Sequence, residues 1–250
     1  MDLGLKDKRV LVSGASRGIG RAIVQLFLDE GAQVEFCARG VSGVEAAGAA
    51  FGARAFGTAV DVTHPQQIAE WVGAAAERMG GLDIVVPNVS ALAGGEDLDT
   101  WRRAFDTDLL GSAAMVKAAL PALRQSAAAS IVLISSVSGR EVDQFAEPYG
   151  ILKAALLHYG KTLSARHAGD GIRVNSVSPG NVYFPDGVWG DIEREQPETF
   201  ARCLAENPLG RMATPLEVAR AVVFLASPAA SFTTGTNLLV DGGLTRGVQF

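Results

Sequence analysis

The sequence has only two cysteines, Cys37 and Cys203, which is too few for a disulfide-rich protein or a cysteine-based metal site. The two lie far apart and lack metal-ligand spacing, so we expect neither a disulfide scaffold nor a zinc or other metal site. Apolar runs are also short, and none approaches the ~20 residues that a membrane-spanning helix needs. Residues 1–9 lack the apolar segment of a secretory signal. We therefore expect a cytoplasmic protein without a membrane partner.

Positive charge is scarce as well. The 250 residues carry a net charge of −5, and no basic run is interleaved with aromatic residues, which argues against a nucleic-acid partner. With 48% hydrophobic residues, a chain of this length can bury the core of one α/β domain. We expect residues 1–250 to form that single domain and to bind small molecules.

Seven short β-branched runs alternate along the chain with stretches of helical periodicity. The expected strands cover residues 10–13, 33–37, 55–60, 84–86, 131–135, 174–178 and 238–240. They are apolar on both faces, which is typical of a parallel sheet covered by helices on both sides. The sequence thus predicts an α/β, doubly wound, Rossmann-type sheet of about seven strands in the order 3-2-1-4-5-6-7.

Two helix starts and one irregular stretch complete this outline. Residues 63–66 and 214–217 each have the form of a capping box with a proline in the first turn. Residues 181–208 are rich in proline, glycine and aromatic side chains, and long irregular connections of this kind usually carry function. We expect a substrate loop there.

A glycine-rich turn, Ser13-Gly14-Ala15-Ser16-Arg17-Gly18-Ile19-Gly20, follows the first strand and leads into a helix over residues 21–30. Gly14 permits the tight turn, Gly18 lets backbone amides approach a pyrophosphate, and Gly20 lets the helix pack closely on the sheet. The spacing alone also fits a loop without a ligand. Its place between a strand and a helix favours a dinucleotide site.

This turn and several later motifs resemble the short-chain dehydrogenase/reductase family, in particular its 3-oxoacyl-acyl-carrier-protein-reductase-like branch. The further matches, in the family's order and spacing, are Asp61-Val62, Pro87-Asn88-Val89-Ser90 in the place of Asn-Asn-Ala-Gly, Ser136, Tyr149, Lys153, Pro179-Gly180 and Asp241-Gly242-Gly243. The resemblance implies cofactor contacts by Gly14, Ser16, Arg17, Gly18, Ile19, Gly20, Arg39, Asp61, Val62, Asn88, Tyr149, Lys153 and Val182. It also implies a homotetramer assembled through helices at about residues 100–126 and 148–168 and through the last strand.

The end of the second strand bears on the choice of dinucleotide. It reads Cys37-Ala38-Arg39, without the carboxylate that an NAD-binding fold usually places there for the ribose 2′-hydroxyl. Arg39 and Arg17 can bind a 2′-phosphate through charge-assisted hydrogen bonds, which favours NADP. The alternative is that both arginines are ordinary solvated surface residues.

Tyr149 and Lys153 lie one turn apart on one face of the expected helix. A phenol is a poor proton donor at neutral pH unless a cation stabilises its phenolate, and Lys153 supplies that charge. Tyr149 is the predicted general acid in reduction and general base in oxidation. The resemblance places Ser136 as the donor to the substrate oxygen, with Ser135 and Ser138 as rivals. An isolated Tyr-x-x-x-Lys match would indicate only an amphipathic helix.

Asp108 stands where the family usually carries a catalytic-site asparagine that holds a lysine-linked water. An ionised carboxylate near Lys153 would offset its positive field on Tyr149. Two unit charges ~4 Å apart interact by ~4 kcal/mol at an effective dielectric of ~20. We expect a more alkaline pH optimum or slower turnover. The alternative is that Asp108 faces solvent or is protonated.

Two further residues depart from the family pattern. Pro87 removes a backbone donor beside the expected adenine site, so the contact there depends on Asn88 and its neighbours. Phe184 replaces the threonine that would bind the nicotinamide carboxamide, which leaves that contact to backbone near Val182.

The aromatic residues of the 181–208 stretch have two interpretations. Tyr183, Phe184, Trp189 and Phe200 could close over an apolar or cyclic substrate, or could pack as a hydrophobic lid on their own helix.

Three functions are compatible with the sequence. The first is an NADP-dependent oxidoreductase that acts on a carbonyl or secondary alcohol, with Tyr149 as its general acid and base. The second is a catalytically weakened NADP-binding protein with a sensing or regulatory role, suggested by Asp108, Pro87 and Phe184. The third, an interaction subunit, gives no reason for the chain to keep its serine, tyrosine and lysine in register.

Overall fold

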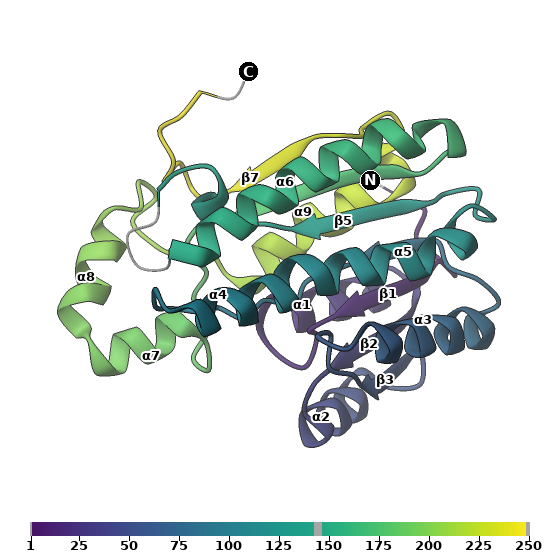
Figure 1. Cartoon of the computed structure of the whole chain (residues 1–250), viewed down its shortest axis with the longest axis horizontal. Coiled ribbons are helices and arrows are strands. Elements are labelled where there is room, and N and C mark those ends of the chain that lie inside the picture. The colour runs from purple at the N-terminus through teal and green to yellow at the C-terminus, as the bar shows by residue number, and fades with distance from the viewer. Residues whose placement is uncertain (1, 143–146, 249–250) are drawn as a thin grey trace.

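The computed structural model describes residues 2–142 and 147–248, which form a parallel sheet between two layers of helices (Figure 1). The strands are β1 (Arg9–Ser13), β2 (Gln33–Ala38), β3 (Ala55–Ala59), β4 (Ile84–Val86), β5 (Ser130–Ile134), β6 (Arg173–Pro179) and β7 (Asn237–Val240). They form one sheet in the order β3-β2-β1-β4-β5-β6-β7, and all neighbouring pairs are parallel. The predicted doubly wound sheet and its strand order are confirmed.

Helices connect the strands throughout. The α-helices are α1 (Gly18–Asp29), α2 (Val41–Phe51), α3 (Pro65–Met79), α4 (Leu98–Ala104), α5 (Gly111–Leu123), α6 (Glu147–His167), α7 (Val188–Glu195), α8 (Pro197–Ala205) and α9 (Pro215–Ala226). A π-helical segment, η1 (Phe105–Leu110), joins α4 to α5, and 3₁₀ turns occur at η2 (Val137–Gly139), η3 (Ala168–Asp170) and η4 (Pro228–Ala230). Within the described ranges, no helix is long and apolar enough to cross a membrane.

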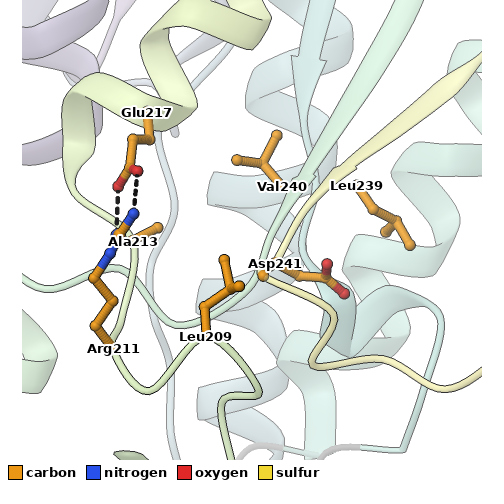
Figure 2. A pocket seen from close by; sticks show the side chains of 8 residues that line it. Leu209, Arg211, Ala213, Glu217, Leu239, Val240 and Asp241 are labelled. Carbon is orange, nitrogen blue, oxygen red and sulfur yellow. Dashed lines mark hydrogen bonds and ion pairs between the residues drawn. The ribbon is translucent and has the colours of Figure 1, made fainter.

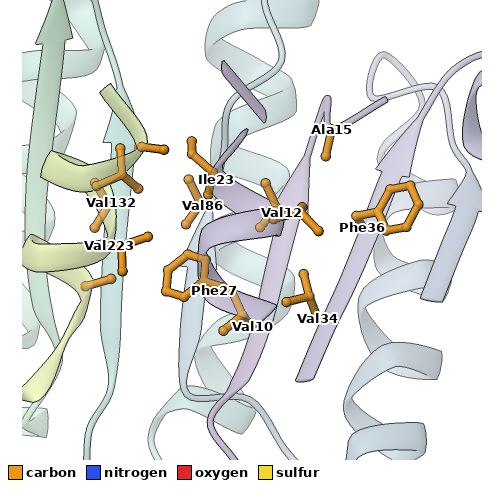
Figure 3. Packing of buried hydrophobic residues seen from close by; sticks show 14 of the residues in the cluster. Val10, Val12, Ala15, Ile23, Phe27, Val34, Phe36, Val86, Val132 and Val223 are labelled. Carbon is orange, nitrogen blue, oxygen red and sulfur yellow. The ribbon is translucent and has the colours of Figure 1, made fainter. Parts of the chain in front are cut away.

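The side chains of each strand alternate between two apolar cores, one on each side of the sheet. In β1, Val10 and Val12 face the core formed with α1 and α9, whereas Leu11 faces the core formed with α3 and α5. Figure 3 shows the first core, where Phe27 of α1 and Val223 of α9 lie with the strand valines. Because helices cover both faces, a ligand is expected at the carboxyl ends of the strands.

The two predicted capping boxes have different outcomes. At α9 the box is present: Thr214 caps the Glu217 amide, and the Glu217 side chain accepts from the Thr214 amide. At α3 the prediction is wrong, because the N-cap is His64 and it makes no side-chain capping bond. The Thr63 hydroxyl instead donates to Asp61 at 2.8 Å, so it does not cap the helix.

Two expected segments also differ in form. The helix expected over about 100–126 is broken into α4, η1 and α5, because residues 105–110 form a π turn. The 181–208 stretch is only partly irregular, since it contains α7 and α8. Pro197 at the first turn of α8 and the extended Gly187 before α7 favour those helix starts.

Two buried carboxylates, Asp83 just before β4 and Glu35 in β2, have opposite electrostatic environments. Burial disfavours ionisation of Asp83, but hydrogen bonds from Arg9 and from Ser126 lower its pKa to about 2. Glu35 of β2 is 1% exposed, and burial raises its pKa although Arg78 and Thr58 act in the other direction. The first carboxylate is stabilised as an anion in the fold, and the second is destabilised as one.

Candidate active site

The glycine-rich turn between β1 and α1 has the backbone form that its spacing predicted. Gly14 and Gly18 have left-handed φ values of +68° and +57°, and a Cβ on Gly20 would lie 2.2 Å from the carbonyl oxygen of Gly14. The Asn88 side-chain amide, from the end of β4, donates to the carbonyls of Ser13 and Gly14 at 3.1 and 3.0 Å. These contacts leave the N-terminus of α1 facing the strand ends, where its amides and dipole can bind an anion.

The aromatic ring of Phe184 lies directly against this turn. A Cβ on Gly18 would be 2.6 Å from Cζ of Phe184, and a Cβ on Gly187 would meet the same atom at 2.6 Å. Arg17 donates from Nη1 to the carbonyl of Asp186 at 3.1 Å, which ties the 184–187 segment to the turn a second time. Glycine at positions 18 and 187 is what permits this approach.

Residues at the ends of β2 and β3 lie beside the turn. Ala38 is buried at the end of β2 and Arg39 after it is exposed, so no carboxylate stands at this strand end. After β3, the Asp61 carboxylate accepts the amide and the hydroxyl of Thr63. These bonds, with smaller effects of the His64 and Arg39 charges, lower the pKa of Asp61 although burial acts in the other direction. Arg17 in the turn and Arg39 after β2 supply positive charge that suits a phosphorylated dinucleotide.

Val182, the expected backbone contact to the carboxamide, pairs with a residue far along the chain. Val182 forms a parallel bridge with Ala213, in which the neighbouring Asn181 carbonyl and Tyr183 amide bond to Ala213. In such a bridge the amide and carbonyl of Val182 point to the opposite side. They are therefore oriented away from Ala213, and the contact to a carboxamide stays a prediction.

Lys153 and Tyr149 lie together on α6, as their spacing predicted. The Lys153 ammonium is 5.5 Å from the centroid of the Tyr149 ring and donates to the carbonyl of Ile134, at the end of β5, at 3.2 Å. The Lys153 side chain is 2% exposed, whereas Tyr149 is half-buried. A buried cation thus lies beside a phenol that solvent or a ligand can still reach.

Ser136 follows β5 and is held close to α6 by two glycines. A Cβ on Gly139 would lie 2.7 Å from the carbonyl carbon of Lys153, and one on Gly150 would lie 2.7 Å from the Ser138 carbonyl oxygen. The Ser136 hydroxyl accepts from the Ser138 amide and donates to the Ser138 hydroxyl, both at 3.2 Å. The sequence analysis missed Gly139 and Gly150. Glycine within an expected helix was the available signal for Gly150.

The rival serine Ser135 has a structural role. Its hydroxyl donates to the backbone carbonyl of Lys153 at 2.8 Å, in a buried position. That bond attaches β5 to α6 and directs the hydroxyl away from any substrate oxygen near Tyr149. Ser136 and its partner Ser138 therefore stay candidates for the donor to a substrate oxygen.

Asp108 points into the site from the π-helical segment η1. Its Oδ1 atom is 3.1 Å from Nζ of Lys153, and both side chains are 2% exposed. Ser90 donates to Oδ1 at 2.5 Å, and the Ala91 amide donates to Oδ2 at 2.8 Å. The alternative that Asp108 faces solvent is therefore wrong. Both carboxylate oxygens of Asp108 thus accept hydrogen bonds from the loop after β4. The sequence analysis did not identify Ser90 as a site residue.

The aromatic side chains after β6 pack mainly against one another. The Phe200 ring is 6.0 Å from that of Tyr183 and 6.5 Å from that of Trp189, in edge-to-face arrangements. The Tyr183 hydroxyl donates to Glu193 at 2.5 Å. These contacts favour the interpretation of a lid packed on its own helices.

A separate small pocket of about 220 Å³ lies at the end of β7, and it is shown in Figure 2. It is lined by Leu209, Arg211, Ala213, Glu217, Leu239, Val240, Asp241 and Gly242. Arg211 and Glu217 pair with each other on one side of it, as the dashed lines in the figure show. None of the lining residues belongs to the Tyr149 cluster. Within residues 2–142 and 147–248, no cluster of three or more histidine, cysteine or acidic side chains is placed to hold a metal.

Comparisons with known proteins identify dehydrogenases and reductases that are similar to this chain. Residues 14–245 match a family model described as enoyl-(acyl carrier protein) reductase. The chain is 42% identical to isoepoxydon dehydrogenase from Penicillium expansum over 99% of this chain and 98% of that protein. It is 39% identical to L-fucose dehydrogenase from Mus musculus, over 96% and 89% of the two chains.

A solved structure shares the fold over its full length. The L-sorbose reductase of Gluconobacter frateurii, in complex with NADPH and L-sorbose, superimposes with a TM-score of 0.91 at 28% identity. The match covers 99% of this chain and all of that one.

Proposed function

The chain belongs to the short-chain dehydrogenase/reductase family, and on that premise we propose that it transfers a hydride between NADP and a carbonyl or secondary alcohol. The observation that carries the proposal is the position of the Lys153 ammonium, buried and 5.5 Å from the centre of the Tyr149 ring. A cation at this place favours the phenolate and makes the tyrosine usable for proton transfer near neutral pH.

In the proposed reaction, four side chains of the site have separate roles. In reduction, Tyr149 gives its phenolic proton to the substrate oxygen, and in oxidation the phenolate takes that proton back. When bound, the cofactor supplies or accepts the hydride at the carbonyl carbon. Ser136 donates a hydrogen bond to the same oxygen, where negative charge develops. Lys153 stabilises the phenolate, and Asp108 determines how much of the Lys153 charge acts on Tyr149.

The proposed cofactor is NADP because the end of β2 offers positive charge and no carboxylate. Arg17 and Arg39 would hold the 2′-phosphate, which an acidic residue at Ala38 would repel. Gly18 and the N-terminus of α1 would receive the pyrophosphate. The other proposed contacts are Gly14, Ser16, Ile19, Gly20, Asp61, Val62, Asn88, Tyr149, Lys153 and Val182.

The substrate we propose is a small hydroxylated ketone or alcohol of about sugar size. L-fucose and L-sorbose in the names of two similar proteins support this class. The packing of Tyr183, Trp189 and Phe200 on one another supports it too, because those rings are engaged and do not form an apolar wall. The serine hydroxyls at the end of β5 are suitable partners for a polar substrate.

We also propose a homotetramer and a cytoplasmic location. Large apolar side chains are exposed on the elements that the resemblance assigns to subunit contacts, among them Leu110 of η1, Ile151 of α6 and Leu238 of β7. Exposed apolar surface of this kind is expected to be covered in an assembly. Light scattering of the purified protein tests the assembly, and cell fractionation tests the location.

The reaction is tested by following the absorbance of NADPH, and separately of NADH, with a panel of sugars and of cyclic, aliphatic and aromatic ketones. We expect turnover with NADPH that falls by about 10²-fold or more in Tyr149→Phe, because proton transfer is lost. Folded Tyr149→Phe with undiminished turnover would overturn the proposed mechanism, and a strong preference for NADH would overturn the proposed cofactor.

The ion pair between Lys153 and Asp108 favours a second candidate function. If the carboxylate cancels most of the charge on Lys153, the chain would bind NADP yet turn over poorly, as a sensing or regulatory protein does. Tight NADPH binding without turnover across the whole panel would select this candidate. Turnover gained in Asp108→Asn would identify the carboxylate as the cause.

A further inference from the structure

Two departures from the family pattern touch each other in this structure. Ser90 stands at the place of the glycine in the family's Asn-Asn-Ala-Gly motif, and Asp108 stands at the place of its asparagine. They are 18 positions apart in the chain, yet the Ser90 hydroxyl donates to Oδ1 of Asp108 at 2.5 Å. A glycine at position 90 could not make this bond. The hydroxyl and the carboxylate therefore form a pair that the usual motif residues lack.

The hydroxyl is held in place by its own loop. The Leu92 amide donates to the Ser90 hydroxyl oxygen at 3.2 Å, which leaves the hydroxyl proton directed at Asp108. The Ala91 amide donates to the second carboxylate oxygen. The loop after β4 thus supplies one side-chain donor and one backbone donor to a carboxylate that is 2% exposed.

The hydroxyl and the Lys153 ammonium share one carboxylate oxygen. Oδ1 of Asp108 is 3.1 Å from Nζ of Lys153 and also accepts from Ser90. A donor at an anionic oxygen takes up part of its negative charge. The more charge Ser90 takes up, the less the carboxylate offsets the field of Lys153 at the Tyr149 ring.

Within residues 2–142 and 147–248, few charged and titratable groups lie around the cluster. Lys153 and Tyr149 face it from α6 and Asp108 from η1, while β5 contributes the Ile134 carbonyl and the β4 loop contributes only Ser90 and two amides. The other charged residues on the elements packed there are exposed: Glu147, Lys161 and Arg166 on α6, Asp106 on η1, Asp99, Arg102 and Arg103 on α4, Lys117 on α5 and Arg140 after η2. The titratable His158, Tyr159 and His167 lie further along α6. Solvent screens those charges, so the buried pair dominates the local field.

We propose that Ser90 is a positioning residue of the active site, whose hydroxyl moderates the charge of Asp108 and so preserves the positive field of Lys153 at Tyr149. This inference rests on the proposed role of Tyr149 in proton transfer. Ser90 acts through Asp108, so its effect exists only while position 108 carries a carboxylate.

The test is a titration of the Tyr149 phenol in the protein without cofactor, followed by the ultraviolet absorbance of the phenolate. Each variant is compared with the same variant carrying Tyr149→Phe, which subtracts the signals of Tyr159 and Tyr183. Ser90→Ala is expected to move the Tyr149 midpoint by about one pH unit to the alkaline side, since a hydrogen bond to a charged group is lost. Asp108→Asn is expected to move it to the acid side.

The double variant decides between a coupled and an independent role. Ser90→Ala in the Asp108→Asn background is expected to add no further shift, and Ser90→Thr, which keeps the hydroxyl, is expected to titrate like the parent protein. Ser112→Ala is the matched control, because the Ser112 hydroxyl bonds to the backbone carbonyl of Asp108 and not to its carboxylate. Ser90→Gly serves as a second hydroxyl-free variant in case the alanine variant does not fold.

Two results would overturn the inference: an unchanged midpoint in the folded hydroxyl-free variants, or an equal shift in both backgrounds. The titration does not require turnover. The expected shifts together with an inactive protein would leave the role of Ser90 standing and contradict only the proposed reaction. Turnover with NADPH but no shift would contradict Ser90 alone.

Discussion

Lys153 and Asp108 form a direct buried ion pair, with 3.1 Å between Nζ and Oδ1 and no more than 2% of either side chain exposed. Asp108 thus places a negative charge next to the Lys153 ammonium, whose positive charge would favour the Tyr149 phenolate. Through Lys153, Asp108 of η1 can therefore affect the proton transfer that we propose for Tyr149 of α6. Burial makes the link strong, because little solvent lies between the two charges to screen them.

Replacing Asp108 by asparagine is expected to move the pH–rate profile of the reduction to the acid side by about one pH unit or more, because the offsetting charge disappears. The measurement is kcat/KM for NADPH-dependent reduction across the pH range. Asp106→Asn, an exposed aspartate on the same π segment, is the control and should leave the profile unchanged. An identical profile for the Asp108 variant would contradict the electrostatic role.

Replacing Arg39 by alanine is expected to reduce the preference for NADPH over NADH by about 10- to 100-fold, since a charge-assisted contact to the 2′-phosphate is lost. The ratio of kcat/KM values for the two cofactors measures the change. Arg220→Ala, an exposed arginine on α9, should not alter the ratio. A ratio that stays constant in Arg39→Ala would show that this arginine is only a solvated surface residue.

Gly18→Ala is expected to weaken NADPH binding by about tenfold or more, because its Cβ would meet the Phe184 ring at 2.6 Å in a left-handed backbone conformation. Adding Phe184→Ala should recover part of the loss by removing the clash. Fluorescence titration with NADPH measures both. Gly73→Ala is the control, since nothing lies within 4 Å of its Cβ. No recovery in the double variant would mean that backbone strain alone limits position 18.

Asp83 is expected to stabilise the fold most strongly above its ordinary pKa of 3.8, and that stability should be lost as the pH falls toward about 2. The sign follows from the lowered pKa, since the folded state favours the carboxylate. Asp83→Asn should cost about 1–2 kcal/mol in denaturant unfolding at neutral pH, and the cost should shrink in acid. The exposed Asp29→Asn is the comparison. A cost that does not vary with pH would refute the assignment.

Glu35 is expected to behave in the opposite way, because burial raises its pKa. Its protonated form is favoured in the fold, so this contribution to stability is present at low pH and is lost as the pH rises through the raised pKa. Glu35→Gln should therefore gain stability relative to the parent protein as the pH rises. Unfolding in denaturant at a series of pH values measures the difference, and a difference that falls with rising pH would contradict the prediction.

The sheet could be predicted from the sequence because its strands are short β-branched runs that are apolar on both faces. The turn after β1 could also be predicted, since Gly14 and Gly18 adopt left-handed backbone conformations and Gly20 lies too close to the Gly14 carbonyl for a side chain. Helix ends were less certain. At α3, the Asp61 carboxylate binds the Thr63 hydroxyl, and a capping pattern in the sequence does not reveal such a competing acceptor.

The contacts that tune the site could not be predicted, because they depend on how separate elements meet. The burial of Asp108 depends on the π segment, and its bond to Ser90 depends on the loop after β4. Gly139 and Gly150 allow two backbone segments to come into contact. The residues next to a glycine in the sequence do not reveal which segment will pack against it in the fold. Spacing along one helix predicted Tyr149 and Lys153 as a pair because there the geometry is local.

The π segment η1 also limits which deletions the chain can tolerate between residues 105 and 110. A π turn holds about one residue more than an α turn, and each helical residue turns the chain by about 100°. Losing one residue from 105–110 would restore a regular helix but rotate Asp108 away from Lys153 or turn Met115 and Val116 out of the core beneath α5. We therefore expect related sequences to substitute residues in this stretch more easily than to delete one. A relative that lacks one residue there should place the residue equivalent to Asp108 differently in its active site.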